Sequence, residues 1–336
     1  MSAIAPTATP GRGAGLRARL ASLIPRDAWL IALWGLLILL LIATKLIRPG
    51  YDAFDLRSLA IGALPVAFAA VAQAVVVISG GIDLSIGSVM ALTSVTAARL
   101  MNDASEEFAI VVVIAVLAMG LLIGLINGVL VVWSRVPDIV VTLAMLYVWA
   151  GAALLVLDRP GGGVADWLRD VTRGPLLIEW LPRALVLLVA VVALVWIPLR
   201  RSRLGLSLYA IGSNRLAAYR SGVEVDRTRI SAYMIAGLFA AVGGLTLTIT
   251  TGIGTPTPGP YTLLAVAAIV LGGVSLAGGQ GGLVGPVVAV FVLSLIRIDL
   301  TFLGVDPNFS IVIQGVIMVA VVMLGAYVTL HRRAAA

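Results

Sequence analysis

A polar stretch of ten residues interrupts one of the most apolar regions of the sequence. Residues 79–88 read Ser-Gly-Gly-Ile-Asp-Leu-Ser-Ile-Gly-Ser and lie between the apolar runs 61–78 and 89–98. A helix in lipid satisfies its own backbone hydrogen bonds, and irregular backbone at membrane depth persists only where protein covers it or where it lines a cavity. The stretch therefore predicts a break between two membrane helices, held inside a larger helical assembly.

Asp83 is the most constraining side chain of this stretch. A carboxylate near the hydrocarbon costs roughly 2.5–3.5 kcal/mol on insertion scales. Asp83 is expected to cap the following helix, as aspartate often does, or to act directly in gating or transport, and the two roles are compatible with one another. The residues of this stretch that we assign to translocation or gating are Gly80, Gly81, Asp83, Ser85 and Gly87.

Composition extends the membrane argument to the whole chain. Of the 336 residues, 61% are hydrophobic and 12% are charged, whereas a soluble domain is about half apolar and about a quarter charged. The chain has no cysteine, which excludes disulfides, thiolate metal sites and a cysteine nucleophile. Its one histidine, His331, lies near the end of the chain, so the sequence also argues against histidine-based chemistry. We expect an all-α integral membrane protein.

Apolar runs of about 20 residues divide the sequence into ten expected membrane spans. They lie near residues 28–44, 58–78, 86–101, 108–133, 136–157, 184–199, 230–251, 261–277, 283–298 and 309–330. We expect one transmembrane domain over 28–330, with broken or re-entrant segments near 79–88 and 272–286. The polar tail 1–27 and the short tail 331–336 flank it.

Loop charges orient these spans. The longest polar loop, residues 200–229, carries seven arginines against two acids, whereas the turn at 102–107 is acidic. Basic loops lie on the cytoplasmic side of a membrane, so we expect both chain ends in the cytoplasm and we do not read the net charge of +7 as a sign of nucleic-acid binding. One outer loop is an exception, because it holds Lys45, Arg48 and Arg57.

A second glycine cluster echoes the first. Gly-Gly-Val-Ser-Leu at 272–276 is similar to Gly-Gly-Ile-Asp-Leu at 80–84. Paired interrupted segments in the two halves of a transporter point to the pathway between them, and we therefore add Gly272 and Gly273 to the gating residues. The alternative is that these glycines let neighbouring helix backbones pack closely.

The Arg-rich loop contains an expected short helix of about two turns. Asn214 is suited to cap its start and Gly222 to end it. Such a helix, with Ala217 and Ala218 on it, is suited to dock into a groove of another protein. The alternative is a solvated basic loop that only fixes topology.

These motifs together resemble the permeases of ABC importers of the ribose, xylose, arabinose and galactose type. The resemblance is carried by residues 80–88, 136–145, 204–223 and 272–286, in the order that this family shows. Two positions depart from the family pattern. Leu216 stands where the coupling helix of related importers has a glutamate, and Asp138 follows Pro137 where an apolar or aromatic residue is common.

The resemblance implies a multi-pass permease of the bacterial inner membrane that imports a monosaccharide, a pentose or a hexose. Its implied partners are a cytoplasmic ABC ATPase, a periplasmic sugar-binding protein, a second permease chain and membrane lipid. Residues Asn214, Ala217, Ala218 and Gly222 would form the ATPase-coupling helix. The resemblance leaves open which sugar is carried and whether the second permease chain is identical.

The sequence lacks the Gly-x-x-x-x-Gly-Lys-Ser/Thr loop that cradles phosphates, and its single lysine is Lys45. We therefore expect a transport subunit that is not an enzyme and holds no cofactor, with ATP and magnesium bound by the partner ATPase. The alternative function is a secondary transporter of a small polar solute, driven by an ion gradient. Such transporters usually need acids at membrane depth, and Asp83 is the clearest one within a span.

Overall fold

The computed structural model of the protein describes residues 28–306, 308–317, 319–320 and 323, and this part of the chain contains helices and no strand. The helices are α2 (Ala28–Ile47), α3 (Ala53–Ile78), α4 (Ile86–Met101), α5 (Glu106–Ser134), α6 (Asp138–Val156), α7 (Asp166–Thr172), α8 (Arg183–Arg201), α9 (Arg203–Ser213), α10 (Arg215–Arg220), α11 (Val225–Thr251), α12 (Tyr261–Leu271) and α13 (Val284–Phe302). A further short apolar helix covers Asn308–Ile317.

Seven of the described helices are long and apolar enough to cross a membrane. They are α2, α3, α5, α6, α8, α11 and α13. The shorter apolar helices are α4, α12 and Asn308–Ile317. The ten helices correspond to the ten expected spans, which confirms the all-α membrane fold. Residues 318, 321–322 and 324–330 of the span 309–330, and the tails 1–27 and 331–336, lie outside the described residues.

The interruptions expected near 79–88 and 272–286 are both present. We call the interruption between α3 and α4 the first break or first segment, and the one between α12 and α13 the second break or second segment. Helix α3 stops at Ile78 and α4 starts at Ile86, while α12 stops at Leu271 and α13 starts at Val284. The 11 residues of α12 reach about 16 Å at 1.5 Å per residue, roughly half of a bilayer core. The expected span 261–277 is therefore a half-length helix followed by an irregular segment.

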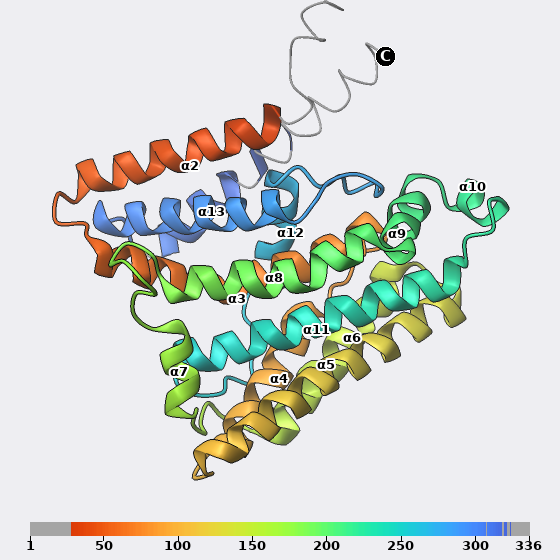
Figure 1. The fold of residues 1–336 in the computed structure, drawn as a ribbon, viewed down its shortest axis with the longest axis horizontal. Coiled ribbons are helices and arrows are strands. Elements are labelled where there is room, and N and C mark those ends of the chain that lie inside the picture. Colours follow the sequence, from red (N-terminus) through yellow and green to blue (C-terminus); the bar gives the residue numbers. More distant parts are fainter. Residues whose placement is uncertain (1–27, 307, 318, 321–322, 324–336) are drawn as a thin grey trace, which may run out of the picture.

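Helix α3 runs through the centre of the bundle (Figure 1). Every residue from Ala67 to Ile78 is fully buried, and most of them are alanine or valine. Small side chains let neighbouring helices approach closely, which is the main source of packing energy between helices in a bilayer. Helices α11, α12 and α13 pack directly on α3, so α3 and the break that follows it lie at the centre of the bundle.

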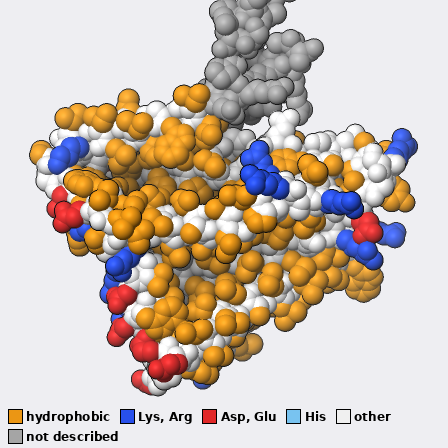
Figure 2. Space-filling model, in the orientation of Figure 1, with side chains coloured by type: hydrophobic (Ala, Val, Ile, Leu, Met, Phe, Trp, Pro, Cys, Tyr) orange, Lys and Arg blue, Asp and Glu red, His pale blue; other side chains and the backbone are white. Residues whose placement is uncertain are grey.

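The peripheral helices present apolar side chains outward. Figure 2 shows an almost continuous hydrophobic surface along the bundle. Residues such as Leu39, Ile114 and Leu155 are more than half exposed on α2, α5 and α6. A belt of this kind is the surface that a bilayer covers.

The two ends of the bundle differ in charge. We call them the α10 end and the α7 end, after the helices that lie there (Figure 1). Lysine and arginine predominate at the α10 end, whereas aspartate and glutamate gather at the α7 end (Figure 2). Helices α7 and α9 were not among the expected elements. Their segments are too short or too polar to give a span signal.

The basic residues at the α2–α3 turn are the exception to the expected charge distribution of the loops, and two of them make local contacts. Lys45 Nζ donates to the carbonyls of Pro49 and Tyr51, both at 2.7 Å. Arg48 lies 3.7 Å from Asp55 and above the ring of Phe302. These two cations are thus held by groups of the same turn and its neighbours.

Candidate functional site

Both interrupted helices end in the same backbone motif. At the end of α3, Gly80 N–H donates to Val77 O at 2.9 Å and Gly81 N–H donates to Val76 O at 3.1 Å. This pair of bonds is a Schellman ending, which needs a left-handed residue after the helix. Gly80 supplies it, with φ of +84°. Gly80 therefore turns the chain away from the axis of α3. The hydrogen bonds from the N–H groups of Gly80 and Gly81 satisfy carbonyl groups in the last turn of the helix.

Helix α12 ends in the same way. Gly273, with φ of +80°, donates to Val270 O at 3.0 Å, and Val274 donates to Ile269 O at 2.9 Å. Gly273 is therefore the structural counterpart of Gly80. The sequence alignment of 272–276 with 80–84 paired Gly80 with Gly272, which is wrong by one residue. The error arises because either glycine of a Gly-Gly pair can match when only letters are compared.

Asp83 lies in a buried polar network that begins at the first break. Its side chain is 4% exposed, and Oδ1 accepts hydrogen bonds from the backbone N–H of Ser85 at 2.8 Å and from its hydroxyl at 2.7 Å. Asn127 of α5 donates to Ser85 Oγ at 2.8 Å, and Trp149 of α6 donates to Asn127 Oδ1 at 3.0 Å. One acid at the break is thus connected to two neighbouring helices.

The expectation that Asp83 caps α4 is wrong. The N-cap position is Ser85, and its side chain makes no capping bond. The backbone N–H of Gly87, which a cap side chain would normally bind, donates instead to Thr262 Oγ1 of α12 at 2.9 Å. Leu84 N–H donates to Thr142 Oγ1 of α6 at 3.1 Å. Thr262 of α12 therefore caps the start of α4, and Thr142 of α6 holds the residue just before its N-cap, which ties the first break to α6 and α12.

A second polar cluster lies against Gly81. Asp138, the first residue of α6, accepts hydrogen bonds from Arg229 at 2.5 Å and from the hydroxyl of Tyr233 at 3.0 Å. Both partners belong to α11. A Cβ atom on Gly81 would lie 2.6 Å from Asp138 Oδ2. The Asp138–Arg229 ion pair therefore rests directly on the backbone of the first break.

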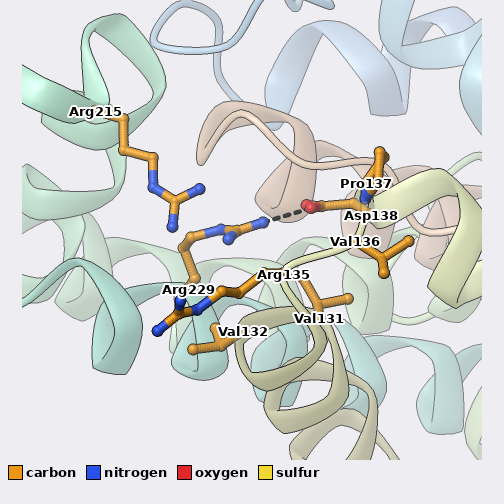
Figure 3. A pocket seen from close by; sticks show the side chains of 8 residues that line it. All are labelled: Val131, Val132, Arg135, Val136, Pro137, Asp138, Arg215 and Arg229. Atoms are coloured by element: carbon orange, nitrogen blue, oxygen red, sulfur yellow. Dashed lines mark hydrogen bonds and ion pairs between the residues drawn. The ribbon is translucent and has the colours of Figure 1, made fainter.

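The ion pair forms one wall of a pocket at the α10 end. The pocket has a volume of about 290 Å³ and is lined by Val131, Val132, Arg135, Val136, Pro137, Asp138, Arg215 and Arg229. In Figure 3, Asp138 and Arg229 point toward one another, and Arg215 reaches toward them from the segment that carries α10. The pocket thus joins the α5–α6 turn, the start of α11 and the first residue of α10.

The structure separates the predicted glycines of the second cluster from the first break. Gly272 packs on Gly285 and Pro286 at the start of α13, and Gly273 lies against the ring of Trp29. The residues of the second segment that do reach the first break are Gly278 and Gly279. Close helix packing, the alternative reading of these glycines, thus describes Gly272.

The short helix of the Arg-rich loop has the expected caps. Asn214 Oδ1 accepts the N–H of Ala217 at 2.9 Å, and Gly222 has φ of +82° just after the helix. Ala218 is buried against Ile211 and Val225, whereas Ala217 is exposed. Leu216 and Tyr219 are 58% and 69% exposed. Helix α10 therefore presents apolar side chains outward at an otherwise charged end of the molecule.

Several residues of the site were not found by sequence reasoning. They are Asn127, Thr142, Trp149, Arg229, Tyr233 and Thr262. A single amide within an apolar span was a readable signal for Asn127, because polar groups at depth need partners. Arg229 was counted with the loop arginines, so its pairing with Asp138 was missed.

The family model described as "Branched-chain amino acid transport system / permease component" matches residues 56–322. This range covers both breaks, the polar network and α10. No solved structure is significantly similar to the chain.

Three named relatives are similar over most of their length. The chain is 32% identical to the ribose import permease protein RbsC of Escherichia coli (strain K12), over 88% of this chain and 94% of the relative. It is 33% identical to the galactose/methyl galactoside import permease protein MglC of Haemophilus influenzae, over 74% and 79%. It is 30% identical to the autoinducer 2 import system permease protein LsrD of Escherichia coli O9:H4 (strain HS), over 92% and 94%. The chain belongs to the monosaccharide-type permease family of ABC importers.

Proposed function

We propose that this chain is the transmembrane permease subunit of an ABC importer and that it carries a monosaccharide from a periplasmic binding protein to the cytoplasm. Its relatives are named as ribose, galactose/methyl galactoside and autoinducer 2 import permeases. A second permease chain, identical or closely related, would complete the pathway. The observation that carries the coupling part of the proposal is α10, a capped helix with exposed Leu216 and Tyr219.

In this proposal the α10 end faces the cytoplasm. Its arginines are Arg200, Arg201, Arg203, Arg215, Arg220, Arg227 and Arg229, against Glu224 and Asp226. The α7 end carries acids such as Asp103, Glu106 and Glu107. An excess of arginine on the cytoplasmic side is the rule for membrane proteins of this kind. The orientation places α10 where a cytoplasmic ATPase reaches it.

Energy would come from the partner. ATP and magnesium bind to the ATPase, because this sequence has no phosphate-cradling Gly-x-x-x-x-Gly-Lys-Ser/Thr loop. The role of this chain is to receive the movement of the ATPase at α10 and to change which end of the pathway is open. The two interrupted segments are the parts of the bundle that lack continuous helical hydrogen bonding, and they are therefore suited to move.

A neutral sugar fits the charge of the buried interior. An amino acid, the substrate class in the description of the family model, carries a carboxylate, which proteins bind with basic side chains or with helix N-termini. The one buried basic side chain of the described residues is Arg229, and it is already paired with Asp138. Sugar hydroxyls need hydrogen-bonding groups of the kind found at Ser85 and Asn127. This distribution supports a monosaccharide.

Affinity purification tests the coupling part of the proposal. The tagged chain is purified in mild detergent from cells that express its natural partners, and the co-purifying ATPase is quantified. Leu216→Asp combined with Tyr219→Asp places charges on the exposed face of α10. Ile178→Asp is the matched control, because Ile178 is similarly exposed, at 63%, but lies in the loop after α7.

We expect the α10 variant to lose the ATPase and the control to keep it. Retention of the ATPase by both variants would remove the docking role of α10. A wild-type chain that purifies without any ATPase, yet transports a solute until an ion gradient is collapsed, would support the gradient-driven alternative instead.

A further inference from the structure

The last turn of α9 lies between the two interrupted segments. Gly279 N–H, in the second segment, donates to the carbonyl of Ile78, the last residue of α3, at 2.9 Å. Gly212 of α9 sits on this bond: a Cβ atom there would overlap both the carbonyl oxygen of Ile78 and the amide nitrogen of Gly279. The two breaks and the end of α9 therefore meet backbone to backbone.

Neighbouring contacts extend this junction. A Cβ atom on Gly278 would lie 2.9 Å from Gly80 Cα and 2.9 Å from Gly212 O. One turn earlier in α9, the hydroxyl of Tyr209 donates to Gly281 O at 2.8 Å. The second segment is thus held at two points of α9, and one of these points also touches the first segment.

The same end of α9 leads directly into α10. Ser213 is the last residue of α9, and the next residue, Asn214, caps α10. Ala218 of α10 packs against Ile211, which is one residue before Gly212. Helix α10 is therefore anchored to the turn of α9 that contacts both breaks, so a displacement of α10 moves that turn.

We propose that Gly212 and Tyr209 are positioning residues for transport, which seat α9 so that a push on α10 reaches both interrupted segments together. The inference rests on the proposed function, in which α10 receives the movement of an ATPase. Coupling between distant sites needs contiguous elements with more than one arrangement. Direct backbone contact is suited to such transmission, because close-packed protein interiors have low compressibility and transmit strain.

Two variants of this junction separate transmission from docking. Gly212→Ala adds one methyl group where Ile78 and Gly279 leave no room. Tyr209→Phe keeps the ring and removes the hydrogen bond to Gly281, so it provides a second variant that disturbs packing little. Gly151→Ala of α6 is the control, because a Cβ atom there meets nothing within 4 Å.

The measurement is the number of sugar molecules imported per ATP hydrolysed by the reconstituted importer, together with the amount of ATPase that co-purifies. For Gly212→Ala we expect wild-type ATPase binding and an import ratio that is about tenfold lower, the size of change that overpacking one state of a two-state equilibrium produces. For Tyr209→Phe we expect a fall of about threefold, which corresponds to one neutral hydrogen bond. Gly151→Ala should match the wild type.

Three results would have distinct meanings. Wild-type import ratios in both Gly212→Ala and Tyr209→Phe would overturn the proposal. Loss of ATPase binding in Gly212→Ala would also overturn it, because the residue would then serve docking and not transmission. A wild-type chain that neither binds an ATPase nor imports with ATP would refute the proposed function on which the inference rests.

Discussion

The hydroxyl of Tyr233 in α11 donates a hydrogen bond of 3.0 Å to Asp138 at the start of α6. Arg229, one helical turn before Tyr233, pairs with the other oxygen of the same carboxylate. Because this carboxylate lies against Gly81, the cluster connects the start of α11 to the first break.

Removing the charge of Asp138 should destabilise the protein and impair uptake. Arg229 and Asp138 have side-chain exposures of 8% and 16%, and loss of one partner leaves a buried charge without compensation, at a cost of about 3 kcal/mol. We expect Asp138→Asn to lower the unfolding temperature in detergent, and Asp138→Asn with Arg229→Gln to recover part of the loss. An Asp138→Asn protein as stable as the wild type would show that the pair contributes nothing.

A methyl group on Gly81 should disturb the same ion pair without removing a charge. The added atom would lie 2.6 Å from Asp138 Oδ2 and 3.1 Å from the hydroxyl of Tyr233. We expect Gly81→Ala to cost about 1–2 kcal/mol of stability and to reduce uptake. Gly62→Ala, on α3 before the break and with nothing within 4 Å, should leave both unchanged. Equal uptake by the two variants would contradict a role for the cluster at the break.

Asn127 should be needed for the network at Asp83. Replacing it with leucine roughly keeps the volume, but the indole N–H of Trp149 loses its acceptor and Ser85 Oγ loses the bond from Asn127 while keeping the one to Asp83. A buried group that loses its partner costs about 1–3 kcal/mol. We expect Asn127→Leu to lower the unfolding temperature, as measured by thermal denaturation of the purified protein. A higher unfolding temperature would mean that the amide is not a structural partner of these groups.

The absence of cysteine gives a direct test of orientation. Ser105→Cys, in the turn before α5, and Ser221→Cys, just after α10, lie at opposite ends of the bundle. A maleimide that cannot cross membranes should label the first variant in intact cells with an opened outer membrane, and the second variant only after the inner membrane is opened. The reverse pattern would place α10 outside and exclude a cytoplasmic ATPase as its partner.

Much of the fold could be predicted from the sequence, because it depends on residues that lie close together in the chain. Long apolar runs placed the spans, and the Asn214 and Gly222 signals placed both ends of the short helix correctly, because a cap depends on residues within one turn. The break at 79–88 was predicted for the same reason: glycines and an acid cannot continue a lipid-facing helix.

The contacts at the site between helices that are distant in the sequence could not be predicted. The start of α4 is capped by Thr262, which is distant in the sequence, so the local expectation that Asp83 is the cap is wrong. The meeting of Gly279 with Ile78 depends on how α3, α9 and the second segment fold together. A single sequence does not carry that information, since each glycine has the same local signature as Gly272, which packs elsewhere.

ATP-driven uptake in proteoliposomes tests the central claim most directly. The chain would be reconstituted with its ATPase, its sugar-binding protein and any second permease chain, and the entry of radiolabelled ribose or galactose would be measured with ATP supplied to the ATPase side. The account predicts uptake of a sugar that requires ATP and the binding protein and persists when ionophores abolish all ion gradients. Uptake that ignores ATP and stops with the ionophores would contradict it.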